Sequence, residues 1–298
     1  MKQRTVICLS SLMLFVFTVK PSWSADIADS RPTASVSIGA EFSSGTYNTD
    51  TTTRIFYLPV VVSWFPHERL DVSVEMPFIY QAYIGTNSAA TATAKTVSRF
   101  GGAGGIISTS TSTASTTTST TTSTTTITPL NSSGSSASVS GLGDVILRAG
   151  YVPIFEKNAL PQVRASLFVK APTASVSEGL GTGEFDFGGG FDLSKWFGNI
   201  HLAGETLYTY QGKVPGLGLK NYLSYTGTVG YQMIHDLQPM LVIKGSTAPS
   251  QYSDDLLEVR GRLLWNFSPA TALDSFITRG ISKSSADYGG GFAVIYSF

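Results

Sequence analysis

The sequence of 298 residues has little charge, a single cysteine and only one long apolar run. Charged residues make up 13%, about half the usual share for a soluble protein. The numbers of basic and acidic residues are equal and no basic stretch occurs, so nucleic acid is not expected as a partner. Cys8 lies in a segment that we expect to be removed, which excludes disulfides and cysteine-based metal sites from the mature chain.

The apolar run over 6–19 follows two basic residues and ends before the small residues Ser22 and Ser24. This order is typical of a secretory signal peptide, with cleavage after residue 24. A membrane anchor is the alternative, but the run is shorter than the ~20 residues that a spanning helix needs. We therefore predict a signal peptide over 1–24 and a mature chain over 25–298.

The mature chain alternates apolar and polar residues with period two, the pattern of strands with one face of each kind. The alternating segments exceed the five or six residues typical of soluble strands, at roughly 10 to 13 residues each. Full charges also occur in mid-strand on the polar face. Both features predict an all-β protein, a transmembrane antiparallel up-and-down β-barrel of about twelve strands. The predicted strands are 33–42, 54–64, 69–81, 143–152, 162–171, 184–196, 200–211, 221–234, 238–248, 255–267, 271–279 and 287–298.

The connections between these segments alternate between short and long. Short turns on one side and long loops on the other are typical of outer-membrane barrels, which places both termini in the periplasm. The longest loop, 82–141, is predicted to face outward. Its Ser/Thr-rich tract, Ser108–Thr126, has little apolar surface to bury, so we expect it to be disordered. It is interpreted as a surface spacer or glycan acceptor, or as a neutral repeat expansion in a tolerant loop.

The polar face of the strands carries charges of both signs, and we expect it to line the lumen. A basic residue facing lipid at the bilayer midplane would cost about 2–4 kcal/mol. Two interpretations stay open, a narrow polar pore and a salt-bridged plug that only stabilises the barrel. The predicted lumen-lining residues are Glu41, Asp71, Glu75, Asp144, Arg148, Arg164, Lys170, Asp186, Asp192, Glu205, Lys244, Glu258, Arg260 and Arg262.

Aromatic residues gather just before the short turns, which predicts a girdle at one membrane interface. The last residue, Phe298, ends a strand that resembles the terminal strand read by the outer-membrane assembly machinery. That machinery and the lipid bilayer are therefore expected partners. The predicted girdle residues are Trp64, Tyr151, Trp196, Tyr231 and Trp265.

Evidence for catalysis is weak. Of the three histidines, His201 is expected to face inward near Glu205, but about 14 Å separates residues four apart in a strand, so they cannot act together directly. The glycine runs Gly188–Gly190 and Gly289–Gly291 have no following helix and no Gly-Lys-Ser/Thr, so they form no phosphate loop. No ligands cluster for a metal. We expect no catalytic residue, cofactor or metal, with an outer-membrane lipase as a minor alternative.

A family resemblance spans residues 33 to 298. Gly141-Leu142-Gly143-Asp144, the loop Pro172–Gly183, Asp186-Phe187-Gly188-Gly189-Gly190 and the glycine-rich final strand are similar to the outer-membrane family of the meta-pathway of phenol degradation. That resemblance implies a barrel that passes small compounds, apolar or aromatic ones among them. It carries no agreed set of functional residues.

These observations together predict a passive channel for small molecules in the outer membrane of a Gram-negative bacterium. A surface adhesin and a structural barrel with a plugged lumen are the alternatives.

Overall fold

The computed structural model describes residues 32–47, 52–84, 137–215, 217–234 and 236–298, with four short strands between residues 96 and 126. The predicted signal peptide, 1–24, lies outside the described residues. The strands are β1 (Ala34–Gly45), β2 (Thr52–His67), β3 (Leu70–Ile84), β4 (Thr96–Phe100), β5 (Gly105–Ile107), β6 (Thr116–Thr118), β7 (Thr122–Thr126), β8 (Ala137–Leu142), β9 (Val145–Ile154), β10 (Gln162–Ala171), β11 (Asp186–Phe197), β12 (Ile200–Tyr210), β13 (Tyr222–Tyr231), β14 (Leu237–Ser246), β15 (Leu256–Ser268), β16 (Thr271–Gly280) and β17 (Tyr288–Ser297).

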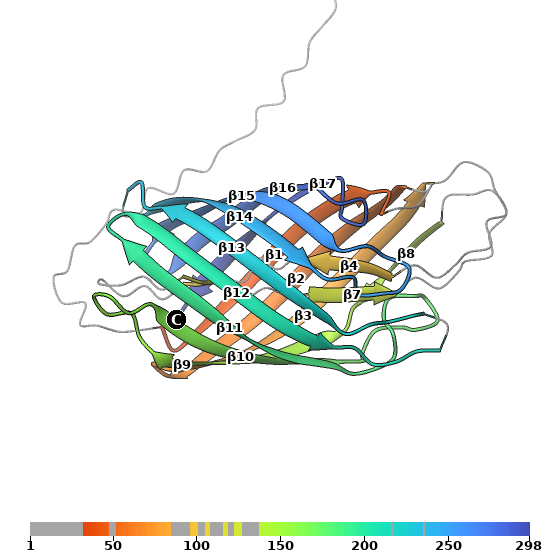
Figure 1. Cartoon of the computed structure of the whole chain (residues 1–298), viewed down its shortest axis with the longest axis horizontal. Coiled ribbons are helices and arrows are strands. Elements are labelled where there is room, and N and C mark those ends of the chain that lie inside the picture. The colour runs from red at the N-terminus through yellow and green to blue at the C-terminus, as the bar shows by residue number, and fades with distance from the viewer. Residues whose placement is uncertain are drawn as a thin grey trace, which may run out of the picture. The chain divides into compact units, whose positions relative to one another are not determined.

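The main sheet closes on itself (Figure 1). Strands β9 to β17 pair antiparallel with their sequence neighbours, β17 pairs with β1, β1 with β2 and β2 with β3. Both β8 and β9 pair with β3, so they form one interrupted strand of the wall. The described residues thus form a closed antiparallel barrel of twelve wall strands, which confirms the predicted fold and strand count.

The interruption between β8 and β9 is a β-bulge. Phe78 pairs with Leu142 and Glu75 pairs with Ile146, so three steps along β3 face four steps along the partner. The extra residue reverses which face each later side chain takes. As a consequence Asp144, just after the bulge, is buried.

The connections alternate in length around the barrel. Two residues join β2 to β3, β11 to β12 and β15 to β16, whereas fourteen residues, 172–185, join β10 to β11. Gly198 provides the positive φ of 60° that the tight β11–β12 turn requires. Thr33 donates its N–H to the carbonyl of Phe298 at 2.9 Å, so the first and last wall strands begin and end together at the short-turn end. The 172–185 segment is called the β10–β11 connection below.

Most of the predicted outer loop, 82–141, lies outside the described residues. The structure extends β3 to Ile84 and begins β8 at Ala137, so the two flanks of that loop belong to the barrel wall. Within the segment, β4 pairs with β7 and β5 with β6. The predicted disorder of Ser108–Thr126 remains a prediction.

Burial follows the period of two along the strands. On β13, for example, buried and exposed residues alternate through all ten positions. Large exposed apolar residues occur on every wall strand, which gives the barrel a continuous apolar outer surface. A surface of this kind is stable in lipid and rare on a soluble monomer. Within the described residues, no helix is long and apolar enough to cross a bilayer.

Glycine at position 190 permits close approach between β11 and β12. A Cβ atom at Gly190 would collide with the backbone carbonyl oxygen of Thr206, which cannot rotate away as a flexible side chain can. We expect Gly190→Ala to lower the free energy of unfolding by about 1–3 kcal/mol. Gly227→Ala is the matched control, because no atom lies within 4 Å of its added Cβ. The measurement is the temperature at which the fast-migrating folded form disappears on a denaturing gel, and equal temperatures for both variants would contradict the prediction.

Candidate functional site

The buried face of the strands carries most of their charge. In a closed barrel the side chains of alternate residues point into the enclosed space, so the buried set is the inner one. Of the fourteen residues predicted to line the lumen, three are partly buried, namely Arg148, Asp192 and Glu205. The other eleven are buried: Glu41, Asp71, Glu75, Asp144, Arg164, Lys170, Asp186, Lys244, Glu258, Arg260 and Arg262.

Arg164 connects strands that are not neighbours. Its Nη1 lies 2.8 Å from Asp192 Oδ2 on the adjacent β11, and its Nη2 lies 2.6 Å from Asp71 Oδ2 on β3. To reach β3 the side chain crosses β9 over Gly150, where a Cβ atom would collide with the guanidinium group. The missing side chain of this glycine therefore makes the bridge between β3 and β11 possible.

Lys170 forms a second network at the long-connection end of β10. Its Nζ lies 3.0 Å from Asp144 Oδ2 and 2.7 Å from Asp186 Oδ2. Asp144 Oδ1 also accepts the backbone N–H of Ala174 at 3.0 Å, and Asp186 Oδ1 accepts that of Gly212 at 2.9 Å. The two carboxylates thus bind the lysine and hold the first residues of the connections that follow β10 and β12.

The β10–β11 connection folds against the inner face of the barrel wall. Ala174 and Leu180 pack into one buried apolar cluster with Ile55 and Tyr57 of β2 and Ile79 of β3. The contact reaches past β9 to strands that are not adjacent to β10. Apolar residues from the connection therefore occupy part of the barrel interior at its long-connection end.

Glu75 links this apolar cluster to the charged interior. The hydroxyl of Tyr57 donates a hydrogen bond to Glu75 Oε1. Arg148 Nη1 lies 2.9 Å from the other carboxylate oxygen, Oε2. Both carboxylate oxygens thus have a donor from a different strand.

A third set of charges lies on β15 and β16. Arg262 binds Asp274 through two hydrogen bonds of 2.8 and 2.5 Å, and Asp274 is 0% exposed. Arg260 Nη2 lies 2.8 Å from Glu258, and its guanidinium carbon lies 4.0 Å from the ring centroid of Phe276. Sequence reasoning did not select Asp274, because its alternation with the neighbouring apolar residues is irregular. The sequence does contain a signal for Asp274, because alternation places it on the same face as the inward residues of β16.

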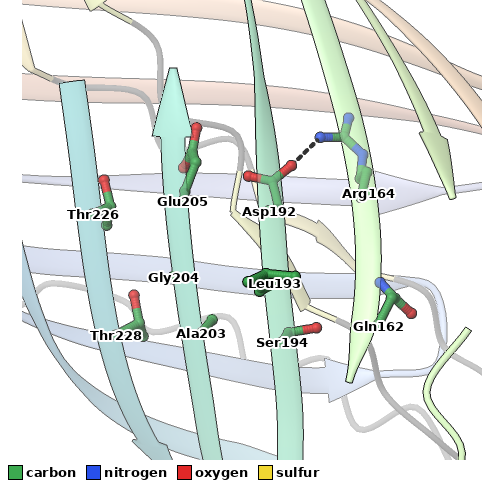
Figure 2. Close-up of a pocket in the computed structure, with 10 residues that line it drawn as sticks. All are labelled: Gln162, Arg164, Asp192, Leu193, Ser194, Ala203, Gly204, Glu205, Thr226 and Thr228. Atoms are coloured by element: carbon green, nitrogen blue, oxygen red, sulfur yellow. Dashed lines mark hydrogen bonds and ion pairs between the residues drawn. The ribbon is translucent and has the colours of Figure 1, made fainter. Parts of the chain in front are cut away.

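A small cavity of about 20 Å³, room for about one water molecule, lies on the inner side of β10 to β13 (Figure 2). Its charged residues are Arg164, Asp192 and Glu205. Asp192 and Glu205 are register partners on β11 and β12, so their side chains stand side by side on one face. The other lining residues are Gln162, Leu193, Ser194, Ala203, Gly204, Thr226 and Thr228. Hydroxyl and amide groups are therefore found among the residues around the charged groups.

The aromatic residues near the short turns take two different orientations. Trp64, Tyr151, Tyr231 and Trp265 are about half exposed, at 46–56%, on the outer face. Trp196 departs from the predicted girdle. It shares the face of Asp192 on β11, and its ring stacks on that of the buried His201 with centroids 4.6 Å apart.

His201 is buried beside Trp196. Neither ring nitrogen has a hydrogen-bond partner among the described residues, so no hydroxyl lies in position to be activated as a nucleophile. In the described part of the chain, no group of three or more His, Cys, Asp or Glu residues could hold a metal ion.

The sequence over residues 78–298 matches the profile of one protein family, described as "Putative MetA-pathway of phenol degradation". The chain belongs to this family. No curated protein matches it in sequence. An outer-membrane channel from Pseudomonas putida F1 has a similar fold, with a TM-score of 0.58 at 11% identity, covering 91% of this chain and 97% of that one.

Two further solved structures are more distant. The KdgM porin matches with a TM-score of 0.48 at 8% identity, covering 89% of this chain and 99% of the porin. The CymD monoaromatic hydrocarbon channel matches with a TM-score of 0.47 at 9% identity, covering 90% of this chain and 89% of that one. The closed barrel with its apolar outer surface, together with the family, places the chain in the outer membrane of a Gram-negative bacterium.

Proposed function

We propose that this protein is a passive outer-membrane channel for small molecules, and that the inner charged residues line its path. The observation that carries the proposal is a closed barrel whose inner face carries many charged residues. Buried ion pairs add little net stability compared with apolar residues of similar volume. Stability alone therefore does not explain the extensive charge inside the barrel.

Purified protein in planar bilayers tests this function. We expect discrete conductance steps in potassium chloride, and swelling of proteoliposomes in a small permeant solute. Heat-denatured protein reconstituted in the same way is the control. A folded preparation that gives neither conductance nor swelling would overturn the proposal.

One observation favours the second candidate, a structural barrel whose lumen is plugged. The β10–β11 connection places Leu180, which is 2% exposed, in the apolar cluster inside the wall. If the lumen is permanently closed, weakening this contact produces no current. If the connection instead closes a path that can open, weakening the contact increases the current, and this second outcome is the one that we expect.

Leu180→Ala is therefore predicted to increase the open fraction of the channel. Truncation of a buried leucine costs about 2–5 kcal/mol. Each ~1.4 kcal/mol is a factor of ten in an equilibrium constant. The ratio of the inward-packed to the displaced form of the connection should therefore fall at least tenfold. Val176→Ala on the same connection is the control, because Val176 is 48% exposed. Single-channel recording measures the open fraction, and equal values for both variants would contradict the prediction.

We also propose that the terminal strand β17 is the segment bound by the outer-membrane assembly machinery. Phe298 is 64% exposed at the short-turn end, next to the strand that closes the barrel with β1. Phe298→Ala should reduce the amount of folded barrel in the membrane, as measured by the unheated band on a gel, without changing the conductance of the barrels that fold.

A further inference from the structure

The charges inside the barrel do not balance. With Asp274 added, the fourteen residues above become a set of nine carboxylates and six basic groups. A passage with an excess of one sign of charge concentrates ions of the opposite sign. The interior therefore favours positively charged solutes.

The excess of negative charge arises because one basic group binds two carboxylates in each of two clusters. Arg164 is bound by both Asp71 and Asp192. Lys170 is bound by both Asp144 and Asp186. Each of these clusters retains one net negative charge after its ion pairs are formed.

The third basic group of this kind is Lys244. It is buried at 4% exposure, and it lies within electrostatic range of Glu41, Glu205 and Glu258 as well as Arg260. These groups together add to the negative side of the interior.

In the Arg164 cluster the two carboxylates are more exposed than the guanidinium group between them. The side chain of Arg164 is 4% exposed, whereas those of Asp71 and Asp192 are 12% and 16% exposed. Glu205 is also partly exposed and lines the cavity. Both oxygens of Asp71 bind Arg164, whereas Asp192 binds it through Oδ2.

The register between β11 and β12 brings two carboxylates together. Asp192 and Glu205 are directly opposite each other on β11 and β12, where like charges repel. The repulsion decreases when a cation lies between or above the two side chains. Thr226, the register partner of Glu205, adds a hydroxyl on the next strand.

We infer that the channel selects cationic over anionic solutes, with Asp192 and Glu205 as the specificity-determining residues. The inference rests on the proposed channel function and narrows it to a solute charge. Inorganic cations and small solutes bearing an ammonium group satisfy the same chemistry.

The test is the reversal potential of purified protein in a planar bilayer under a potassium chloride gradient. We expect a potassium-to-chloride permeability ratio above unity for the wild type. Glu205→Gln and Asp192→Asn should each lower the ratio, and Glu205→Lys should bring it to unity or below. Asp287→Asn, an exposed carboxylate in the β16–β17 connection, should leave it unchanged.

The outcomes separate the inference from the function on which it rests. Conductance with a ratio at or below unity overturns cation selectivity and leaves the channel. Equal ratios in the wild type and the Glu205 and Asp192 variants overturn the assignment of those residues. No conductance from a heat-modifiable barrel overturns the channel, and the selectivity with it. The gel shift on heating verifies that each variant is folded.

Discussion

Replacing Arg164 by methionine is expected to lower the free energy of unfolding by about 3–5 kcal/mol, because removal of one partner leaves buried charges without compensation. The variant keeps most of the side-chain volume but leaves Asp71 and Asp192 facing one interior with no guanidinium between them. Arg279→Met, at an exposed position on β16, should change stability much less. Thermal loss of the unheated gel band or denaturant titration in detergent measures the difference.

A triple variant tests whether uncompensated charge causes the loss of stability in Arg164→Met. Arg164→Met together with Asp71→Asn and Asp192→Asn removes the uncompensated charge along with the cation. Replacement of a whole buried ion cluster by neutral groups is often nearly neutral for stability. We therefore expect the triple variant to be more stable than Arg164→Met alone. A triple variant that is less stable would show that the hydrogen bonds across Gly150, and not the charge balance, dominate.

The second large effect is expected at Asp274. Asp274→Ala removes the carboxylate that binds Arg262 through two hydrogen bonds, in a pair that is almost fully inaccessible to water. The predicted loss is again about 3–5 kcal/mol of unfolding free energy. Asp287→Ala removes an exposed carboxylate from the neighbouring connection and is the matched control. Comparable denaturation midpoints for the two variants would disprove a structural role for this pair.

A second variant, Asp274→Asn, separates the hydrogen bonds of this pair from its Coulombic attraction. The amide can still accept one hydrogen bond from Arg262 but no longer neutralises it. An intermediate stability is expected, because the geometry is conserved while the Coulombic attraction is lost. A variant as stable as the wild type would assign the stabilisation to hydrogen bonding alone.

The periodic features of this protein were readable from its residues. Alternation over segments such as 69–81 and 255–267 predicted the strands, because a strand turns successive side chains to opposite sides whatever its neighbours are. Connection lengths predicted the arrangement of the barrel, since antiparallel neighbours need only two residues at a tight turn. The same alternation assigned the charged residues to the face that the structure buries.

Features that depend on register between strands were not readable. Alternation predicts that Asp144 faces inward, but the β-bulge at Gly143–Asp144 is visible only in the pairing with β3, and the ion pair with Lys170 only in the structure. Trp196 is a different case, because its even spacing from Asp192 is present in the sequence: the place before a turn predicts the outer girdle, whereas the spacing places it inward on His201. The position of a residue along its strand predicts its depth in the membrane. Its odd or even place in the alternation decides whether it faces lipid or the barrel interior.

The sequence by itself determined the class of fold, the order of the strands and the sign of each inner charge. Tertiary structure alone decided which charges pair, that Arg164 reaches Asp71 across Gly150, and that Leu180 of the β10–β11 connection lies inside the wall. The physical reason is that ion pairs join residues that are far apart in the sequence. Alternation is a property of one strand, whereas an ion pair depends on the register of three strands and on whether an intervening residue has a side chain.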